Sequence, residues 1–544
     1  MTHSLATVCR GKAPLLLCCL LLAQVLISLP RLDRPFLEGR EHWVIDDAAN
    51  LLRAIHSQDR TLPTRLGIFG LKEYVYDAEG AVVGFKHYHH HPVLTALLFK
   101  TFTLAAGFHH WVPRTFALIL SLLTTAAVFL LLRSVTEDDG LAFAFALLHV
   151  LLPLHFNYQD AWKHEVTAGL FVWLCFLFLH HADEGRGYRR AFLVSFFLLF
   201  QSGWVAYPVA GGMLLYVFLL RRSRGLGSFP GQALAAAIAG IAVNFTILAV
   251  LGARPQNLGS HALVRMSGQM QGLSLRDWAA TQAGFLSANF THLNVILAIL
   301  LLAACGLRFG ARSHPLTVFG GMTMAGVAAY LAVFRNQCHS HHYIQWLTGA
   351  AIVLTLAGAY GTLKEAGTIR PGRLRAGAFA LLLVLLSWSL RASYRMETDI
   401  QESDFASAED IDAIVRQQRR LVVSWDGKSG PKGWWISSPI QLYTDPFYKA
   451  WRLGRRPEPA SGGIAHMDPA ARPVAIRRGS DVVVAMNSPD SVNGMRALLA
   501  RSFGVRCLRL DSVTPMLAFL VPAADSDCAG SRAGRMLPAR SRAP

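Results

Sequence analysis

The chain contains little charge and few acidic residues. Only 16% of its 544 residues are charged, and 34 Asp and Glu stand against 52 Lys and Arg, which gives a formal net charge of +18. In soluble globular proteins about a quarter of the residues are charged, whereas a disordered chain has a far smaller apolar share than the 53% found here. The composition therefore argues against both classes.

Cysteine is also scarce and scattered. Eight cysteines in 544 residues are too few for a disulfide scaffold, and their spacing matches no metal-binding motif. Only Cys507 and Cys528 are placed so that they could pair in an oxidising compartment, and the sequence leaves their state open.

The chain contains instead long apolar runs without charge. Four segments have no Asp, Glu, Lys or Arg: Thr115–Leu132, Ala191–Leu220, Gly225–Ala253 and Trp278–Leu307. Each is long enough to cross a bilayer, which needs about 20 apolar residues. The basic residues fall mostly in short loops between such runs, so a membrane topology explains the positive net charge better than nucleic-acid binding does.

These basic loops determine the predicted topology. Arg10 and Lys12 place the start of Ala13–Leu29 in the cytoplasm, whether that run is a signal peptide or, as we expect, an uncleaved first helix. Four further basic loops then belong on the cytoplasmic side: Arg186–Arg190, Arg221–Arg224, Arg308–Arg312 and Lys364–Arg375. About eleven spans satisfy this requirement.

The predicted spans follow the apolar runs. They lie near residues 13–29, 115–133, 141–157, 165–181, 190–203, 204–220, 231–252, 288–307, 316–334, 343–363 and 376–391. The run Ala191–Leu220 has basic clusters at both ends, so it must cross twice and reverse near Gly203. By the same parity, Pro92–Gly107 stays on the outer side as an interfacial or re-entrant helix, and residues 253–287 also lie on the outer side.

The predicted organisation has three parts. Residues 1–391 form a transmembrane catalytic domain with its first outer loop at 30–114, residues 392–528 form a soluble extracytoplasmic α/β domain, and residues 529–544 form a disordered basic tail. In the second part, residue patterns predict strands at Leu421–Ser424, Asp481–Ala485, 505–510 and 516–521, and helices at Asp410–Arg420 and Val492–Phe503.

Three polar segments fall on the predicted outer side, and the first is in the first outer loop. It carries Asp46 and Asp47, then Lys86 and a histidine run that ends at His91. The two acids would equally suit a helix N-terminus, where they complement the helix dipole. We predict no metal site at the histidines, because adjacent side chains point in different directions, although the sequence leaves a divalent cation open.

The other two polar segments end apolar spans. Asn157–Glu165 contains Asp160, Lys163 and Glu165, and Arg335–Tyr343 contains Arg335 and His342. Both segments could serve as interfacial belts that anchor the chain. The density of ionisable groups at one membrane face is instead typical of a functional cavity, and an arginine there would suit a phosphate.

The order of these features resembles the GT-C superfamily of glycosyltransferases. The residues that carry the resemblance are Asp46-Asp47-Ala48 after the first span, His91-Pro92-Val93-Leu94 opening an interfacial helix, Val112-Pro113-Arg114 before the second span and Asp160 after the third. The pattern is similar to the polyprenyl-phosphate-sugar-dependent transferases, which include dolichyl-phosphate-mannose protein mannosyltransferases and the lipid A aminoarabinose transferase. The resemblance covers roughly residues 13–390.

This resemblance implies a GT-C-like fold with a juxtamembrane helix and a C-terminal extracytoplasmic domain. It implies that Asp46 is the catalytic base, with Asp47 where Glu is more usual, and that His342 and Tyr343 approach the donor phosphate. The chain departs from the pattern at Asn50, where Tyr is common, at the single Pro92, and at Gly203-Trp204, where relatives have Lys-Gly. Sugar, polyprenol and acceptor therefore stay open.

The predicted function is transfer of a sugar, with inversion, from a polyprenyl-phosphate donor to an acceptor hydroxyl on a lipid, glycan or protein. We expect it on the extracytoplasmic face of a bacterial inner membrane. Predicted roles are catalysis for Asp46, Asp47 and Asp160, donor-phosphate binding for Lys86, Arg114, Arg335, His342 and Tyr343, and acceptor or sugar orientation for His91, Lys163 and Glu165. The alternative is a transporter or flippase for a lipid-linked or anionic solute, whose charges would lie in mid-span.

Overall fold

The structure is a computed structural model that describes residues 12–32, 71–76, 82–87, 92–106, 111–182, 185–224, 227–250, 266, 274–310, 313–367, 369–416, 420–424, 464–467, 481–486, 508–513 and 517–522. The chain divides into two compact units, which we describe separately. The first comprises residues 1–34, 57–70 and 88–399, and the second comprises residues 35–56, 71–87 and 400–544.

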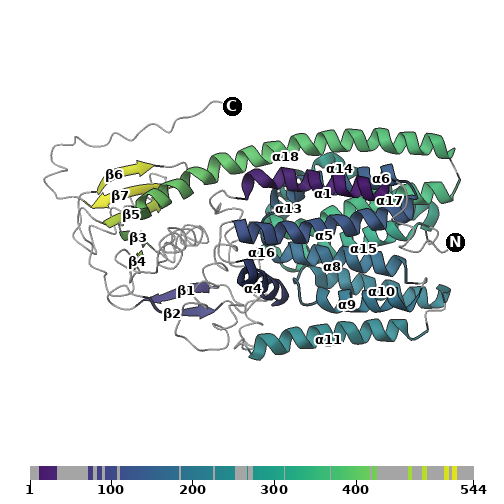
Figure 1. Cartoon of the computed structure of the whole chain (residues 1–544), viewed down its shortest axis with the longest axis horizontal. Coiled ribbons are helices and arrows are strands. Elements are labelled where there is room, and N and C mark those ends of the chain that lie inside the picture. The colour runs from purple at the N-terminus through teal and green to yellow at the C-terminus, as the bar shows by residue number, and fades with distance from the viewer. Residues whose placement is uncertain are drawn as a thin grey trace. The chain divides into compact units, whose positions relative to one another are not determined.

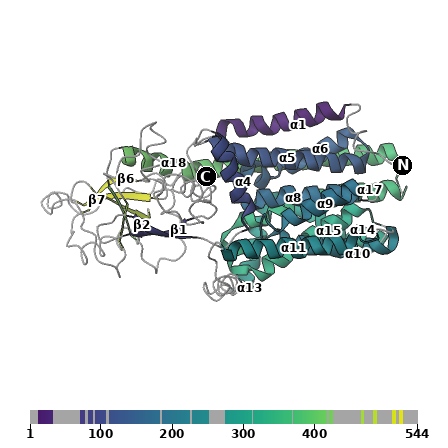
Figure 2. The same ribbon diagram turned by 60° about the horizontal axis from the view of Figure 1, so that its bottom comes forward.

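The first unit is a bundle of helices. In chain order they are α1 (Ala13–Ser28), η2 (Leu29–Arg31), α4 (Leu94–Ala106), α5 (Trp111–Thr136), α6 (Asp139–Leu151), α7 (Pro153–Tyr158), α8 (His164–His180), α9 (Arg186–Leu199), α10 (Ala206–Arg224), α11 (Phe229–Val250), α13 (Leu275–Phe290), α14 (His292–Phe309), α15 (Pro315–Val333), α16 (Arg335–Ser340), η5 (His342–Gln345), α17 (Trp346–Glu365) and α18 (Pro371–Arg416). Figures 1 and 2 show α5, α8, α9 and α11 running alongside one another, and each contacts the next.

Helix α17 forms the core of this bundle. Within the described residues, 94% of the most apolar stretch of His342–Glu365 is buried. The corresponding share is 22% for the span that contains α1 and 17% for α14. Close packing of α15 on α17 depends on glycine, because a Cβ on Gly358 would collide with the backbone of Thr317. The outer helices expose apolar side chains such as Leu300 and Ile238, as lipid-facing helices do.

Seven of the described helices are long and apolar enough to cross a membrane. They are Ala13–Arg31, Trp111–Thr136, Phe229–Val250, His292–Phe309, Pro315–Val333, His342–Glu365 and Pro371–Thr398. The other predicted spans form the shorter helices α6 to α10. The chain is therefore a helical multi-pass membrane protein, and a total of about eleven spans stays a prediction.

The predicted reversal inside Ala191–Leu220 is confirmed. Helix α9 ends at Leu199, α10 begins at Ala206, and Gly203 lies in the turn between them, close to the carbonyl of His164. Helix α13 begins at Leu275, inside the segment 253–287 that the sequence assigns to the outer side without predicting a helix there. Ser274 caps this helix by accepting a hydrogen bond from the Asp277 N–H.

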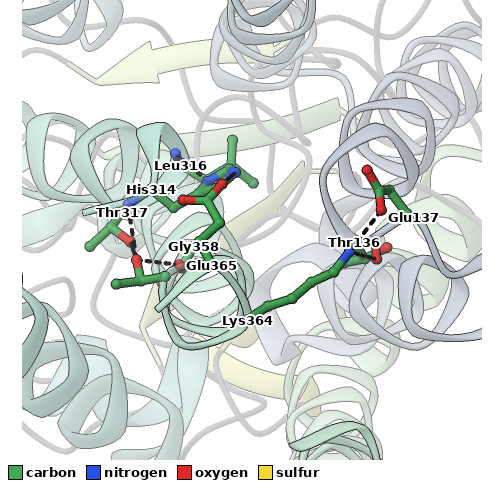
Figure 3. A network of polar contacts seen from close by, with 9 residues as sticks. Thr136, Glu137, His314, Leu316, Thr317, Gly358, Lys364 and Glu365 are labelled. Carbon is green, nitrogen blue, oxygen red and sulfur yellow. Dashed lines mark hydrogen bonds and ion pairs between the residues drawn. The ribbon is translucent and has the colours of Figure 1, made fainter. Parts of the chain in front are cut away.

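Polar contacts at one end of the bundle support the alternation of helix directions. Figure 3 shows Lys364, at the end of α17, donating hydrogen bonds to the Glu137 carboxylate at 2.9 Å and the Thr136 carbonyl at 3.2 Å. His314 Nε2, just before α15, lies 3.7 Å from the Glu365 carboxylate. The ends of α5 and α17 and the start of α15 therefore meet, as the predicted topology requires.

The described strands belong to the second unit. β1 (Leu71–Tyr76) and β2 (Val82–His87) form an antiparallel pair that the sequence did not predict. The others are β3 (Arg420–Ser424), β4 (Ile464–Met467), β5 (Asp481–Met486), β6 (Leu508–Val513) and β7 (Leu517–Pro522), in the sheet order β4-β3-β5-β7-β6. β3 is parallel to β4 and β5, whereas β7 is antiparallel to β5 and β6.

The structure contains the four strands that the sequence predicts in the C-terminal part. Four of the strands lie where the sequence places them, near 421–424, 481–485, 505–510 and 516–521. Helix α18 continues without a break through the expected boundary at 391–392 as far as Arg416. The predicted helix Val492–Phe503 and the tail 529–544 lie outside the described residues, and the α/β domain at 392–528 stays a prediction.

Candidate functional site

The candidate site forms where α7 gives way to α8. Pro153 begins α7 after a short break from α6, because a proline ring cannot continue the preceding helix. Helix α7 ends at Tyr158, and residues 159–163 form a turn before α8 begins at His164. This turn presents the charged residues of the second polar segment at one end of the bundle.

Lys163 carries a positive charge into the protein interior. Its side chain is 1% exposed, and its Nζ lies 3.5 Å from the centre of the Tyr343 ring and 5.1 Å from that of Tyr158. The negative face of an aromatic ring attracts a cation. Glu165, in the first turn of α8, also interacts electrostatically with Lys163. The cation therefore lies against two rings and interacts with a carboxyl group.

A second contact joins the same two polar segments. The Tyr158 hydroxyl and His342 Nε2 lie 2.8 Å apart, and the two rings meet edge to face. Together with the Lys163–Tyr343 contact, this hydrogen bond brings the second and third predicted polar segments together. We call Tyr158, Lys163, Glu165, His342 and Tyr343 the outer cluster.

A buried ion-pair group lies against the same turn. Asp160 is fully buried, and its Oδ2 lies 3.3 Å from Arg31 Nε at the end of η2. Arg31 also lies 3.2 Å from Glu397 on α18 and donates a hydrogen bond to the Phe156 carbonyl at 3.1 Å. A buried charge needs such partners, because leaving it alone in a low-dielectric interior is costly. Arg31 thus ties the end of the first span to the turn and to α18.

Arg114 supports this arrangement from α5. It is 2% exposed, and its Nη1 donates hydrogen bonds to the carbonyls of Arg31 at 2.6 Å and Leu32 at 3.2 Å. The carbonyls at the end of a helix need external donors, and Arg114 supplies them here. These two hydrogen bonds therefore hold the backbone beside Arg31.

Helix α4 begins at the same end of the bundle. The Leu94 N–H donates to the Gln201 carbonyl at 3.0 Å, and the Thr95 hydroxyl donates to the Ser202 carbonyl at 3.3 Å. Phe99 packs on Trp162 of the turn, with ring centres 5.0 Å apart. The predicted juxtamembrane helix is thus present, and it packs against the reversal between α9 and α10.

Of the remaining predicted site residues, only Arg335 has a side chain in the described part of the chain. Arg335 is exposed on α16, and no contact described for it reaches the cluster. The backbone of Lys86 lies in β2, but its side chain is outside the described part of the chain. Asp46, Asp47 and His91 also lie outside the described residues, and their roles stay predictions.

Several residues at this end are absent from the sequence predictions. Arg31 follows an apolar run directly and reads as an ordinary flanking charge, and Glu397 lies beyond the predicted end of its span. Tyr158 resembles an interfacial aromatic residue. Only the fold shows that Arg31 contacts Asp160, that Glu397 contacts Arg31 and that Tyr158 contacts His342.

The described side chains do not form a metal centre. Within that part of the chain, no three His, Cys, Asp or Glu residues lie together so that they could hold a metal ion. Burial raises the pKa of the Cys338 thiol to about 12, and the negative charge of Glu165 adds to this rise. The thiol therefore stays protonated near neutral pH, which disfavours it as a metal ligand or nucleophile.

Comparison with known proteins identifies the fold. No protein-family model and no curated protein matches the sequence. Among solved structures, ArnT from Cupriavidus metallidurans bound to undecaprenyl phosphate is similar at 12% identity with a TM-score of 0.56, over 95% of this chain and 99% of that one. The apo state of ArnT is similar at 13% identity with a TM-score of 0.54, over 96% and 100%.

The class defined by the fold is a helical multi-pass membrane protein with the architecture of the ArnT structures. ArnT from Cupriavidus metallidurans, in its lipid-bound and apo states, is among the solved structures with this fold. At this level of identity the likeness establishes the fold alone.

Proposed function

We propose that this protein is an integral membrane glycosyltransferase that moves a sugar from a polyprenyl-phosphate donor to an acceptor hydroxyl, with inversion. The observation that carries the proposal is the outer cluster, where Lys163 lies buried against Tyr343 and beside His342. A lipid phosphate keeps its tail in the bilayer and its anionic head at the surface. A cation held at one end of a helical bundle suits that head.

The fold adds support to this choice of donor. ArnT, which shares the architecture, has been solved with undecaprenyl phosphate bound. Lys163, which the sequence assigns to sugar orientation, contacts Tyr343, which it assigns to the donor phosphate. We therefore extend to Lys163 the donor-phosphate role that the sequence gives to His342, Tyr343, Lys86 and Arg335.

The proposed reaction is a single displacement. The Asp46 carboxylate takes the proton of the acceptor hydroxyl while the oxygen attacks the anomeric carbon, with Asp47 beside it. The bond from that carbon to the phosphate oxygen breaks, its electron pair leaves with the phosphate, and polyprenyl phosphate is released. Attack from the face opposite the leaving group inverts the anomeric centre. The cations stabilise the charge that develops on the departing phosphate.

Two residues receive modified roles. Asp160 is engaged by Arg31, and Arg114 donates to the carbonyls of Arg31 and Leu32. We propose that both position the turn and the end of the first span, and that neither touches the substrate. His91 and Glu165 keep their proposed roles in acceptor or sugar orientation.

The transporter alternative is less well supported by the described helices. Charged residues such as Arg114, Lys364 and Glu397 lie near the ends of the helices that could span the membrane. A transport pathway would place such charges in the middle of the spans. The bacterial inner membrane as the location is also part of the proposal.

Transfer of labelled sugar tests the proposed function. Purified wild type and Asp46→Asn are reconstituted in lipid with a panel of polyprenyl-phosphate sugars and candidate acceptors. We expect wild type alone to release polyprenyl phosphate, while both proteins unfold at the same temperature. Equal activity of the variant would remove Asp46 from the role of base, and a folded wild type that consumes no donor would contradict the proposed function.

A further inference from the structure

Helix α13 presents one polar face to the outer cluster. Gln282 and Asn289 are spaced seven residues apart, which places them on the same side of a helix. Gln282 is 5% exposed and Asn289 is fully buried, whereas their neighbours Ala283 and Ala288 are exposed. Phe285 lies between them on this face, with its ring centre 5.8 Å from that of His342. Two amides are thus buried where a helix would ordinarily bury apolar groups.

The two amides belong to a continuous relay of hydrogen bonds. Asn289 Nδ2 donates to the His342 carbonyl at 2.9 Å and to Gln345 Oε1 at 3.2 Å. Gln345 Nε2 donates in turn to Gln282 Oε1 at 3.0 Å, and Gln282 Nε2 donates to the Cys338 carbonyl at 2.8 Å. The relay therefore runs from one end of the segment 338–345 to the other.

The direction of each amide in this relay is determined by its neighbours. The carbonyls of Cys338 and His342 can only accept, so Gln282 and Asn289 must turn their NH2 groups toward them. The amide of Gln345 then has a single orientation that serves both, with its oxygen toward Asn289 and its nitrogen toward Gln282. Such head-to-tail bonds polarise one another, which strengthens each bond of the relay.

The segment held by the relay supplies two members of the outer cluster. His342 and Tyr343 meet Tyr158 and Lys163 across the gap between η5 and the turn at 159–163. These contacts depend on where the backbone places the two side chains. A shift of the His342 carbonyl would move both together.

We propose that Asn289 and Gln282 are positioning residues of the donor-phosphate site and that α13 acts on that site through the segment 338–345. The inference rests on the proposed function. Asn289 also begins the sequence Asn289-Phe290-Thr291, which matches an N-glycosylation pattern, but its buried amide is already used for the His342 carbonyl. The asparagine therefore serves the site and is not an exposed glycan acceptor.

The substitution Asn289→Asp tests the proposal with little change in volume. It replaces the donating amide by a carboxylate that faces two oxygen acceptors. We expect kcat for sugar release to fall about tenfold or more. The loss of kcat in Asn289→Asp should become smaller as the pH is lowered, because the protonated carboxyl group of the new aspartate can again donate to the His342 carbonyl.

The matched control is Asn294→Asp on the neighbouring helix. Asn294 is equally buried and donates to the Phe290 carbonyl and to Ser389 Oγ, both at 2.9 Å, but lies outside the relay. We expect it to keep the wild-type kcat and pH profile, even where its unfolding temperature falls. Should Asn289→Asp not fold, Gln282→Leu removes only the far end of the relay and is expected to lower kcat in the same direction.

The possible outcomes distinguish a failure of the positioning role from a failure of the proposed function. If wild type is active and Asn289→Asp keeps its kcat and pH profile, the positioning role is wrong and the transferase remains. The positioning role is also wrong if Asn294→Asp lowers kcat to the same extent with the same pH dependence. If wild type consumes no polyprenyl-phosphate sugar, the proposed function is wrong, and the positioning role that depends on it is wrong as well.

Discussion

The ammonium group of Lys163 lies 3.5 Å from the centre of the Tyr343 ring, although the two residues belong to polar segments far apart in the sequence. Glu165 provides the nearby negative charge. This pair unites the turn after α7 with the segment before α17. It places an ammonium group in the interior at this end of the bundle, where the lysine is 1% exposed.

Replacing Lys163 alone should destabilise the protein. Lys163→Gln leaves Glu165 without its cation, and loss of one partner of a buried pair costs about 3–5 kcal/mol. The double variant Lys163→Gln/Glu165→Gln removes both charges and should regain most of that stability. Thermal unfolding in detergent compares the stabilities of wild type, the single variant and the double variant. A double variant no more stable than the single one would contradict an interaction between Lys163 and Glu165.

The sequence predicted much of this region, and the reasons for its gaps are physical. Apolar run length and loop charge predicted the helices and the reversal near Gly203, because both depend on local composition. The residues Asp160, Lys163 and His342 were marked by their unusual position at span ends. Arg31 and Glu397 were missed, since only tertiary contact distinguishes a paired buried charge from an ordinary flanking one.

Helix α13 was missed for a related reason. Its buried face contains Gln282 and Asn289, so it lacks the apolar stripe by which an amphipathic helix is recognised. Its amides are satisfied by segment 338–345, a partner that is distant in sequence and therefore invisible in local patterns.

Arg31 and Asp160 are expected to be energetically coupled. Arg31→Met should lower the free energy of unfolding by about 3–5 kcal/mol, because Asp160 is left buried. Adding Asp160→Asn should cost less in that background than in wild type, with a coupling energy of at least about 1 kcal/mol. Reversible unfolding of wild type, the two single variants and the double variant in mixed micelles gives this coupling energy. Additive effects of the two substitutions would show that the ion pair between Arg31 and Asp160 contributes nothing.

The contact between α15 and α17 should not tolerate a side chain at Gly358. Gly358→Ala places a methyl group against the Thr317 backbone and should cost about 1–3 kcal/mol. Gly377→Ala on α18 is the control, because no atom lies within 4 Å of its added Cβ. Removing a helical glycine there should stabilise the protein by about 0.5–1 kcal/mol. Equal unfolding temperatures for the two variants would contradict the described packing.

The predicted orientation can be tested by labelling introduced cysteines. Arg335→Cys and Arg373→Cys place exposed thiols at residues assigned to the outer side and the cytoplasmic side. Cys338, close to the first position, is buried with its pKa raised to about 12, so its own labelling should be slow. A membrane-impermeant maleimide should label Arg335→Cys in intact cells and Arg373→Cys only after permeabilisation. The reverse pattern would invert the topology.

The most direct test of the central claim is the affinity for undecaprenyl phosphate of wild type and of Lys163→Gln/Glu165→Gln. The double variant removes the Lys163 ammonium group together with the carboxyl group that interacts with it. We expect wild type to bind and the variant to bind about 100-fold more weakly, which corresponds to about 2.8 kcal/mol. Equal affinities in folded proteins would show that the outer cluster is not the site of the lipid phosphate.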